Sequence, residues 1–497
     1  MPSINRNSPI PIYHQLKAII KEQIESGVWR PGDCIPTEQE LCQQYAISRS
    51  PVRQALKELV FEGLLFRRAG LGTFVEGCIA GEPATDTPIR MMNSDPHWSR
   101  VLDHASRAWN ATHPNLRIQF EIESVSHNAL YSTLSAAVGS GTAPDVAMVD
   151  GVWVAGLAQS GFLYPLQDQT AETQRKHGEF AQGLHPAFVE ANSHAGKLYG
   201  LPAKSDTSLL WYRKDWFERE GLAPPRNWQA LLDVARYFLQ PALQARYDGP
   251  HPLIFPGGAV AGEATVYNLM PFVWSAGGEI FNTEGAVALD TPATRRALQF
   301  LQELIAVHHV VPPEVTGYDE HTTPHLFARG KAAMALGGSY ESDVILDASG
   351  WDYEAFSRRV GYVAPPSAPD GHSVSTVGGT SYVVLRQCPS PTLVMDVLQL
   401  VTDPAVVGDM YRQTLQNLPS PAFDALLRPA TDPLLTQTSR MIASGRARPS
   451  IPGYVKLSRQ LQAMFEAAMS GDEPIGDITR RTSEFIGVIV ELPCRSS

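Results

Sequence analysis

Three basic residues at one-turn spacing, Arg49, Arg53 and Lys57, could read DNA. Residues four positions apart lie on the same face of a helix. The other side of this helix is predicted to be buried, and its apolar residues are Val52, Leu56 and Leu59. An arginine on a helix in the major groove can donate two hydrogen bonds to guanine O6 and N7. The plainer alternative is an ordinary helical bundle with a solvated basic face.

The segments around this helix favour the DNA-binding alternative. Apolar residues at helical spacing predict a first helix over residues 11–26. Thr37 and Glu40 have the spacing of a capping box, which predicts the start of a short second helix. Residues 64–68 and 73–75 predict two strands, and the glycines between them permit a tight hairpin tip. Together these elements predict an N-terminal winged helix-turn-helix unit of the α+β class.

Several motifs in this region occur in the order found in one known family. They are Pro9-Ile10-Pro11-Ile12, Pro31-Gly32-Asp33, Pro36-Thr37-Glu38, Ser48-Arg49-Ser50, Val52-Arg53-Gln54-Ala55-Leu56, Glu62-Gly63-Leu64 and Gly70-Leu71-Gly72-Thr73-Phe74-Val75. Residues 8–76 resemble the N-terminal domain of GntR-family transcriptional regulators. The resemblance implies DNA contacts by Arg49, Ser50 and Arg53, with Gly70 at the wing tip in the minor groove.

Two positions depart from the pattern of that family. Gln39 stands where the family usually has arginine, which implies a weaker contact with the DNA backbone. Pro51 stands where a threonine is common, so that a hydroxyl contact is lost.

Charge separates this region from the rest of the chain. Residues 1–77 hold nine Lys and Arg against eight Asp and Glu, whereas the whole chain holds 40 against 51. An acidic body should be repelled by DNA, so specific affinity should rest on a few arginines and on dimerisation. We therefore expect a homodimer that binds a palindromic double-stranded operator.

The pattern beyond residue 77 predicts a separate, larger domain. Residues 78–88 lack periodicity and contain several residues that interrupt helices and strands, among them Gly81, Pro83 and Pro88, which is typical of a linker. Strands then alternate with helices, which predicts an α/β domain with largely parallel sheets. About 410 residues exceed what one core usually supports, so we expect two lobes over residues 89–497.

Several motifs occur in a characteristic order along this domain. They include Gly141-Thr142-Ala143-Pro144-Asp145-Val146, Gly196-Lys197-Leu198-Tyr199-Gly200-Leu201-Pro202, Gly277-Gly278-Glu279-Ile280, Phe327-Ala328-Arg329-Gly330-Lys331, Gly378-Gly379 and Ile451-Pro452-Gly453-Tyr454. By these motifs the domain resembles the extracellular solute-binding proteins that deliver sugars to bacterial ABC transporters. Members of that family carry an export signal, and none is predicted in this chain, which favours an effector sensor over a transport protein. The resemblance implies a two-lobed periplasmic-binding-protein-like α/β fold that closes over a ligand.

Sugars present flat C–H faces and many hydroxyls, so their sites combine aromatic rings with carboxylates and backbone donors. By position in the motifs, the candidate ligand-binding residues are Trp153, Asp206, Trp274, Tyr340, Glu341 and Gly379. Trp153, Trp274 and Tyr340 are expected in loops, and each aromatic could equally be a core residue. Weaker candidates are Tyr212 and Tyr454. Trp98, Trp109 and Trp228 are assigned to core helices.

Other classes of protein were weighed against this hypothesis. Some GntR-type regulators carry an aminotransferase-like domain, but lysine is scarce after residue 57 and none lies in a Ser-x-x-Lys arrangement for pyridoxal phosphate. Glycoside hydrolysis has no supporting motif, and a transport subunit would require secretion. Five scattered cysteines argue against a disulfide frame or a zinc site. We therefore expect a cytoplasmic, carbohydrate-sensing transcription factor with no catalytic residues, metal, cofactor or membrane span.

Overall fold

The protein has two compact units. One comprises Met1–Thr87 with Asn110–Ile118, and the other comprises Pro88–Trp109 with Gln119–Ser497. The computed structural model describes residues 4, 11–25, 28–29, 32–61, 64–68, 72–75, 86–95, 98–166 and 183–491. Most of the predicted linker, residues 78–88, falls outside that range, so its boundaries stay a prediction.

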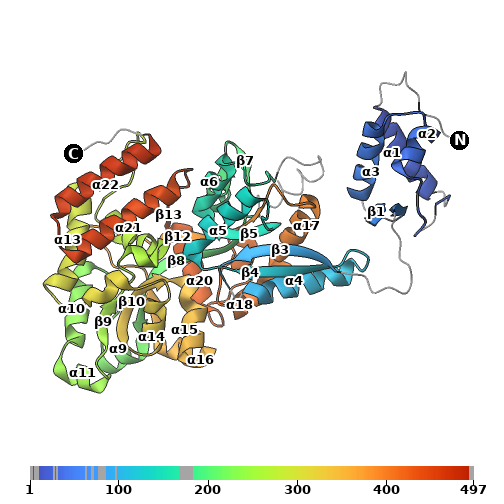
Figure 1. Cartoon of the computed structure of the whole chain (residues 1–497). Helices are drawn as coiled ribbons and strands as arrows, with labels where there is room; N and C mark the ends of the chain where they lie inside the picture. The colour runs from blue at the N-terminus through green and yellow to red at the C-terminus, as the bar shows by residue number, and fades with distance from the viewer. Residues whose placement is uncertain are drawn as a thin grey trace. The chain divides into compact units, whose positions relative to one another are not determined.

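The N-terminal unit contains the elements of the predicted winged helix-turn-helix (Figure 1). They are α1 (Ile12–Glu25), α2 (Glu38–Gln44), α3 (Arg49–Phe61), β1 (Leu65–Arg68) and β2 (Gly72–Val75). Helices α1 and α2 both pack on α3, and their shared core includes Leu16, Ile20, Leu41, Val52 and Leu59, which are fully buried. The apolar spacing in the sequence therefore predicted the buried faces correctly.

Local hydrogen bonds fix the start of α2 and the wing. The Thr37 amide donates to Oε2 of Glu40 at 2.7 Å, and the Glu40 amide donates to Oγ1 of Thr37 at 3.3 Å, which confirms the capping box. Strands β1 and β2 pair in antiparallel register with Phe66 opposite Phe74, and their ring centroids lie 5.5 Å apart. Gly70, the predicted wing tip, lies outside the described residues.

The large unit is built on one nine-stranded sheet with the order β4-β3-β5-β12-β8-β10-β9, in which β11 also pairs with β8 and β13 with β12. Its strands are β3 (Thr87–Asn93), β4 (Ile118–Ser124), β5 (Val146–Asp150), β8 (Gly200–Arg213), β9 (His251–Ile254), β10 (Ala332–Gly338), β11 (Val360–Val363), β12 (Thr376–Val384) and β13 (Arg446–Ala447). A separate hairpin joins β6 (Ser193–His194) to β7 (Lys197–Leu198).

Strand β8 joins two halves of this sheet. Residues 200–207 of β8 pair with β12, and residues 208–213 pair with β10 and β11. We call the half with β3, β4, β5 and β12 the first lobe, and the half with β9, β10 and β11 the second lobe. One continuous strand thus belongs to both lobes, as a hinge strand does.

The sheet is mixed, so the expectation of largely parallel strands is wrong. Strand β12 runs antiparallel to both β5 and β8, and β10 runs antiparallel to β8. Parallel pairing is confined to β3 with β5, β9 with β10 and β12 with β13 among the described pairs. Alternation of helices and strands predicts crossover connections between parallel strands. However, β12 runs opposite to its neighbours β5 and β8, and β8 runs opposite to β10 and β11, which local patterns do not encode.

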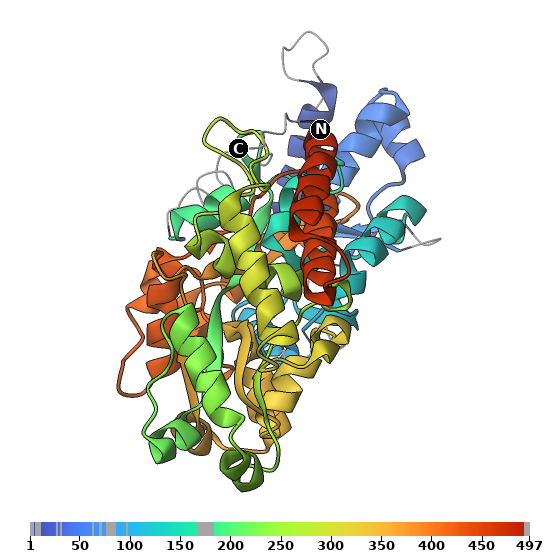
Figure 2. The same ribbon diagram turned by 90° about the vertical axis from the view of Figure 1, so that its left-hand side faces the viewer.

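Helices cover both lobes. They are α4 (Ser99–Thr112), α5 (His127–Ser140), α6 (Val154–Gln159), α8 (Pro186–Ala191), α9 (Lys214–Glu220), α10 (Trp228–Phe238), α11 (Pro241–Arg246), α12 (Glu263–Ser275), α13 (Pro292–Ala306), α14 (Thr322–Ala328), α15 (Ser342–Ser349), α16 (Tyr353–Arg359), α17 (Pro391–Val401), α18 (Pro404–Gln413), α19 (Pro421–Asp424), α20 (Pro433–Ser444), α21 (Tyr454–Ser470) and α22 (Ile475–Val490). Short 3-10 helices are η2 (Gly151–Trp153), η3 (Ala259–Ala261), η4 (Pro313–Gly317) and η5 (Ser339–Glu341). Helices α21 and α22 pack together against α13 (Figures 1 and 2).

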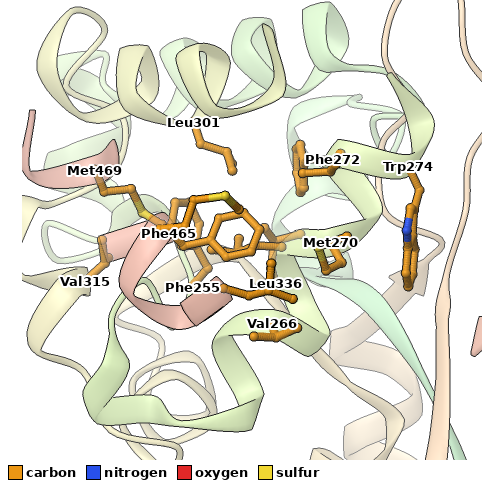
Figure 3. Close-up of a cluster of buried hydrophobic side chains, with 14 of the residues drawn as sticks. Phe255, Val266, Met270, Phe272, Trp274, Leu301, Val315, Leu336, Phe465 and Met469 are labelled. Atoms are coloured by element: carbon orange, nitrogen blue, oxygen red, sulfur yellow. The ribbon is translucent and has the colours of Figure 1, made fainter. Parts of the chain in front are cut away.

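Helix α12 is the central helix of the core. All of its residues except Ala264 are buried, as expected for a helix that is apolar on all sides. Its side chains meet Phe255, Leu336 and Phe465 in one cluster, while Trp274 lies apart from the other labelled side chains (Figure 3). Trp98, Trp109 and Trp228 are buried as expected, although Trp98 immediately precedes α4.

Gly379 of β12 lies directly against the backbone of the hinge strand β8. Its φ is +153°, and a Cβ atom there would lie 2.0 Å from the carbonyl oxygen of Lys204. Just after it, the register of β12 against β8 shifts between Thr380 and Ser381. A side chain at position 379 would therefore force β12 away from the hinge strand.

We expect Gly379→Ala to lower the free energy of unfolding by at least roughly 1–3 kcal/mol, because strained backbone and a backbone clash combine. Gly139→Ala is the matched control, since Gly139 is exposed in α5 with no atom within 4 Å of the new Cβ. That change should be neutral or stabilising by up to about 1 kcal/mol. Equal stability of the two variants in denaturant titrations would contradict this role of Gly379.

Glu341 is a buried acid in the core of the second lobe. Its Oε2 accepts hydrogen bonds from Nε1 of Trp211 at 3.0 Å and from the Gly338 amide at 3.2 Å. Its relative exposure is 2%. Burial raises the pKa of Glu341 from 4.5 to about 8, so the side chain is mostly neutral at pH 7.

The raised pKa of Glu341 makes the stability of the folded state depend on pH. The contribution of the protonated side chain to folding is fully present below pH 4.5 and is lost as the pH rises to about 8. Glu341→Gln keeps the two accepted hydrogen bonds but cannot ionise. We therefore expect the melting temperature of the wild type, relative to that of Glu341→Gln, to fall between these two pH values. Parallel pH dependences in thermal unfolding would show that Glu341 ionises freely in the folded protein.

Candidate functional site

The predicted DNA-reading residues lie on the exposed start of α3. Arg49, Ser50 and Arg53 are all exposed. Nε of Arg53 donates to Oε2 of Glu38 at 2.8 Å, and Nη2 of Arg67 lies 3.4 Å from the other oxygen of Glu38. Glu38 of α2 therefore holds two arginines, one from α3 and one from β1. Glu38 lies in a family motif, but the sequence did not predict that it would position these two arginines.

The second candidate site lies where β8 and β12 join the lobes. Asp206 of β8 is opposite Gly378 of β12, and the hydroxyl of Tyr267 in α12 donates to Oδ1 of Asp206. A Cβ on Gly378 would lie 3.1 Å from this carboxylate and 2.9 Å from the Tyr267 ring. Burial raises the pKa of Asp206, and this effect exceeds the lowering by Tyr267 and nearby cations.

A buried arginine connects the two lobes at this point. Nη2 of Arg448 lies 3.0 Å from Oδ1 of Asp150, which ends β5 in the first lobe. Nη1 lies 2.5 Å from Oε1 of Glu263, which begins α12. The hydroxyls of Tyr454 and Ser458 also donate to Glu263. We call Asp150, Arg448 and Glu263 the cleft triad.

Arg448 is not among the residues predicted from the sequence to bind a ligand. It lies three residues before the motif that begins at Ile451, so its place next to a family motif was the available signal. Its side chain is 2% exposed, and its guanidinium carbon lies 5.1 Å from the Tyr267 ring centroid and 5.9 Å from that of Tyr454. A planar cation between aromatic rings and two carboxylates is held in a fixed orientation.

A second ion pair lies beside the same hinge strand. Nζ of Lys204 is 2.7 Å from Oδ2 of Asp95, which follows β3, and 5.4 Å from the Trp98 ring centroid. Burial alone would lower the pKa of Lys204, but the carboxylates of Asp95, Asp343 and Asp206 outweigh it and raise the pKa. Lys204 is therefore a buried, charged group between carboxylates.

The cavity beside the triad is small. Its lining includes Asp150, Asn192, Gly378, Gly379, Ser381 and Arg448, and its volume is about 30 Å³. Pockets that bind small molecules typically measure roughly 300–1,000 Å³. A sugar could therefore enter only if the groups that line this cavity move apart.

The structure brings together some of the predicted ligand-binding residues. The ring centroids of Tyr340 in η5 and Tyr267 lie 5.6 Å apart, and Tyr267 donates to Asp206. Gly379 lines the cavity next to Arg448. Trp153 of η2 is buried and lies 4.9 Å from the ring of His127.

Two predicted positions have different surroundings. Trp274 is in the last turn of α12 and not in a loop, so that expectation is wrong; its ring lies 4.8 Å from the Arg446 guanidinium. The glycines at 277 and 278 suggested a loop, but the apolar run before them continues the helix. Glu341 contacts Trp211 in the core of the second lobe, as described above. Its predicted ligand contact stays untested, as do those of the other candidates.

The described residues also bear on metal binding and on membrane insertion. Among the described residues, no group of three His, Cys, Asp or Glu side chains could hold a metal ion. The same part of the chain contains no helix of the length and apolarity that a membrane span requires. Cys34, Cys42 and Cys388 are free thiols.

Two family models match the chain. Residues 99–407 match the bacterial extracellular solute-binding proteins, and residues 12–75 match the bacterial regulatory proteins of the gntR family. Neither is a family of enzymes.

Individual relatives agree with this division. The histidine utilization repressor of Klebsiella aerogenes is 53% identical over 70 residues, which are 14% of this chain and 29% of that protein. A putative binding protein of Brucella abortus is 27% identical over 310 residues, 62% of this chain and 68% of that protein. The structure of maltose-bound MalE3 of T. maritima matches with a TM-score of 0.70 at 23% identity, covering 81% of this chain and all of the other, and so shows the fold. The chain belongs to the bacterial extracellular solute-binding protein family and carries a gntR-family helix-turn-helix domain at its N-terminus.

Proposed function

We propose that this protein is a cytoplasmic transcriptional regulator whose large unit binds a carbohydrate effector and thereby changes its affinity for operator DNA. The observation that carries the proposal is the presence, in one chain, of a gntR-family domain with Arg49 and Arg53 exposed and a solute-binding fold with an interlobe site. We further propose that it acts as a homodimeric repressor of genes for carbohydrate uptake or catabolism, on a palindromic operator.

The choice of carbohydrate rests on the chemistry of the interlobe site. Aromatic rings at Trp153, Tyr267 and Tyr340 lie near carboxylates at Asp150 and Asp206. This combination suits a ligand with apolar C–H faces and many hydroxyls. A similar fold holds maltose in MalE3 of T. maritima, which supports a sugar as the first class to test.

The alternative functions draw less support. A transport subunit would have no use for an exposed pair of arginines on a recognition helix. An aminotransferase-like domain would need a different fold over residues 99–407, which match solute-binding proteins.

Arg49→Ala and Arg53→Ala should each weaken operator binding by roughly 1–3 kcal/mol per contacted half-site, because each removes a cation from the exposed face of α3. Lys331→Ala is the control, since it removes one exposed positive charge from the large unit. Fluorescence anisotropy with operator DNA at fixed salt measures the effect. Wild-type affinity in both arginine variants would rule out α3 as the reading helix.

Effector and operator should influence each other equally. A sugar that changes operator affinity by a factor of roughly 5–150 must have its own affinity changed by the same factor when operator is added. Calorimetry of the sugar with and without operator measures this. Tyr340→Ala should lose most sugar affinity and keep sugar-free operator binding, because the Tyr340 ring lies beside Tyr267, which donates to Asp206. Identical sugar affinities with and without operator in the wild type would mean that this sugar is not the effector.

A further inference from the structure

The interlobe site holds more carboxylates than cations. In the described part of the chain, its carboxylates are Asp95, Asp150, Asp206, Glu263 and Asp343, and its cations are Lys204 and Arg448. The ring of His127 also lies 3.9 Å from Asp150 and adds a positive charge only when it is protonated. Lys204 pairs with Asp95, and Arg448 serves both Asp150 and Glu263. Asp206 receives its hydrogen bond from the neutral hydroxyl of Tyr267. The site therefore carries a net negative charge when these carboxylates and cations are ionised, even with His127 protonated.

This excess is buried and hence costly. Asp150, Asp206 and Glu263 have relative exposures of 5%, 6% and 8%. An uncompensated charge at such burial is strongly unfavourable unless it is neutralised or paired. The raised pKa of Asp206 has the same cause, because burial opposes its ionisation. A ligand that brings positive charge would relieve this cost, whereas a ligand with another negative charge would increase it.

A second observation indicates an acceptor group in the ligand. Nε of Arg448 is buried and has no hydrogen-bond partner in the described structure, although both terminal nitrogens are paired. Arg448 is 4% exposed and lines the cavity beside the cleft triad together with Asp150 and Gly378, and Gly378 lies directly against the Asp206 carboxylate. A buried N–H without an acceptor is unfavourable, and a hydroxyl oxygen of a bound sugar would satisfy it.

We infer that the effector is a basic amino sugar, whose ammonium group pairs with Asp206 and whose hydroxyl oxygens accept from Arg448. This inference rests on the proposed function, since it specifies the class of carbohydrate bound at the same site. Asp206 is the specificity-determining residue. Uronic acids and sugar phosphates are excluded by the surplus of carboxylates.

The test uses the full chain and three sugars that differ in charge. Glucosamine is cationic, glucose neutral and glucuronate anionic at pH 7, and their β-1,4-linked oligomers extend the series. Calorimetry should show that the amine binds at least about tenfold more tightly than the neutral sugar, with no binding of the acid. Raising the salt concentration should weaken binding of the amine and leave the affinity for the neutral sugar unchanged.

Asp206→Asn removes one negative charge and should reduce the preference for the amine to less than about threefold. Asp248→Asn is the matched control, because it removes an exposed carboxylate that pairs with Lys331. It should keep the wild-type preference. An unchanged preference in a folded Asp206→Asn variant would overturn the role of Asp206.

The wild-type series decides the question even if the variant fails to fold. Equal or tighter binding of the neutral sugars would overturn the inference about charge and leave the proposed function standing. Failure of every sugar and oligomer to bind would overturn both.

Discussion

The buried arginine beside the hinge strands is the interaction on which the arrangement of the candidate site depends. Arg448 is paired with Asp150 of the first lobe and Glu263 of α12, and these three groups are almost completely buried. Removing one partner of such a set leaves a buried charge without compensation, which typically costs about 3–5 kcal/mol. Opening of the lobes would expose the triad to water, which can solvate the separated charges. The triad thus holds the closed form most firmly while water is excluded from it.

The hinge strands explain why these charges are together. Strand β8 contributes Lys204 and Asp206 while it passes from one lobe to the other, and β12 lies beside it with glycines at 378 and 379. The absence of a side chain at Gly378 leaves room for the Asp206 carboxylate and the Arg448 guanidinium, and its absence at Gly379 leaves room for the backbone of Lys204. A motif that looks like a flexible turn in the sequence is therefore a place of close packing.

The charged residues of the two units differ in burial and suit different tasks. In the N-terminal unit, Glu38 orients Arg53 and Arg67, and the pairs are exposed, so each contributes little to stability and can exchange its carboxylate for phosphate. In the large unit the charges are buried, and their balance matters because water does not screen them. The first arrangement suits reversible binding of DNA. The second suits discrimination among small ligands by charge.

The sequence by itself determined the local elements and the two families. Helix periodicity, the Thr37–Glu40 capping box and the glycines of the wing depend on neighbours within a few residues, so they can be predicted from spacing. The tertiary structure decided what the cleft contains. Arg448 and Asp150 are 298 residues apart, and Glu341 reaches Trp211 across 130 residues, so no local pattern reveals either contact. The direction of β8 and β12, the helical position of Trp274 and the burial of Glu341 have the same origin, because each is fixed by packing between distant segments.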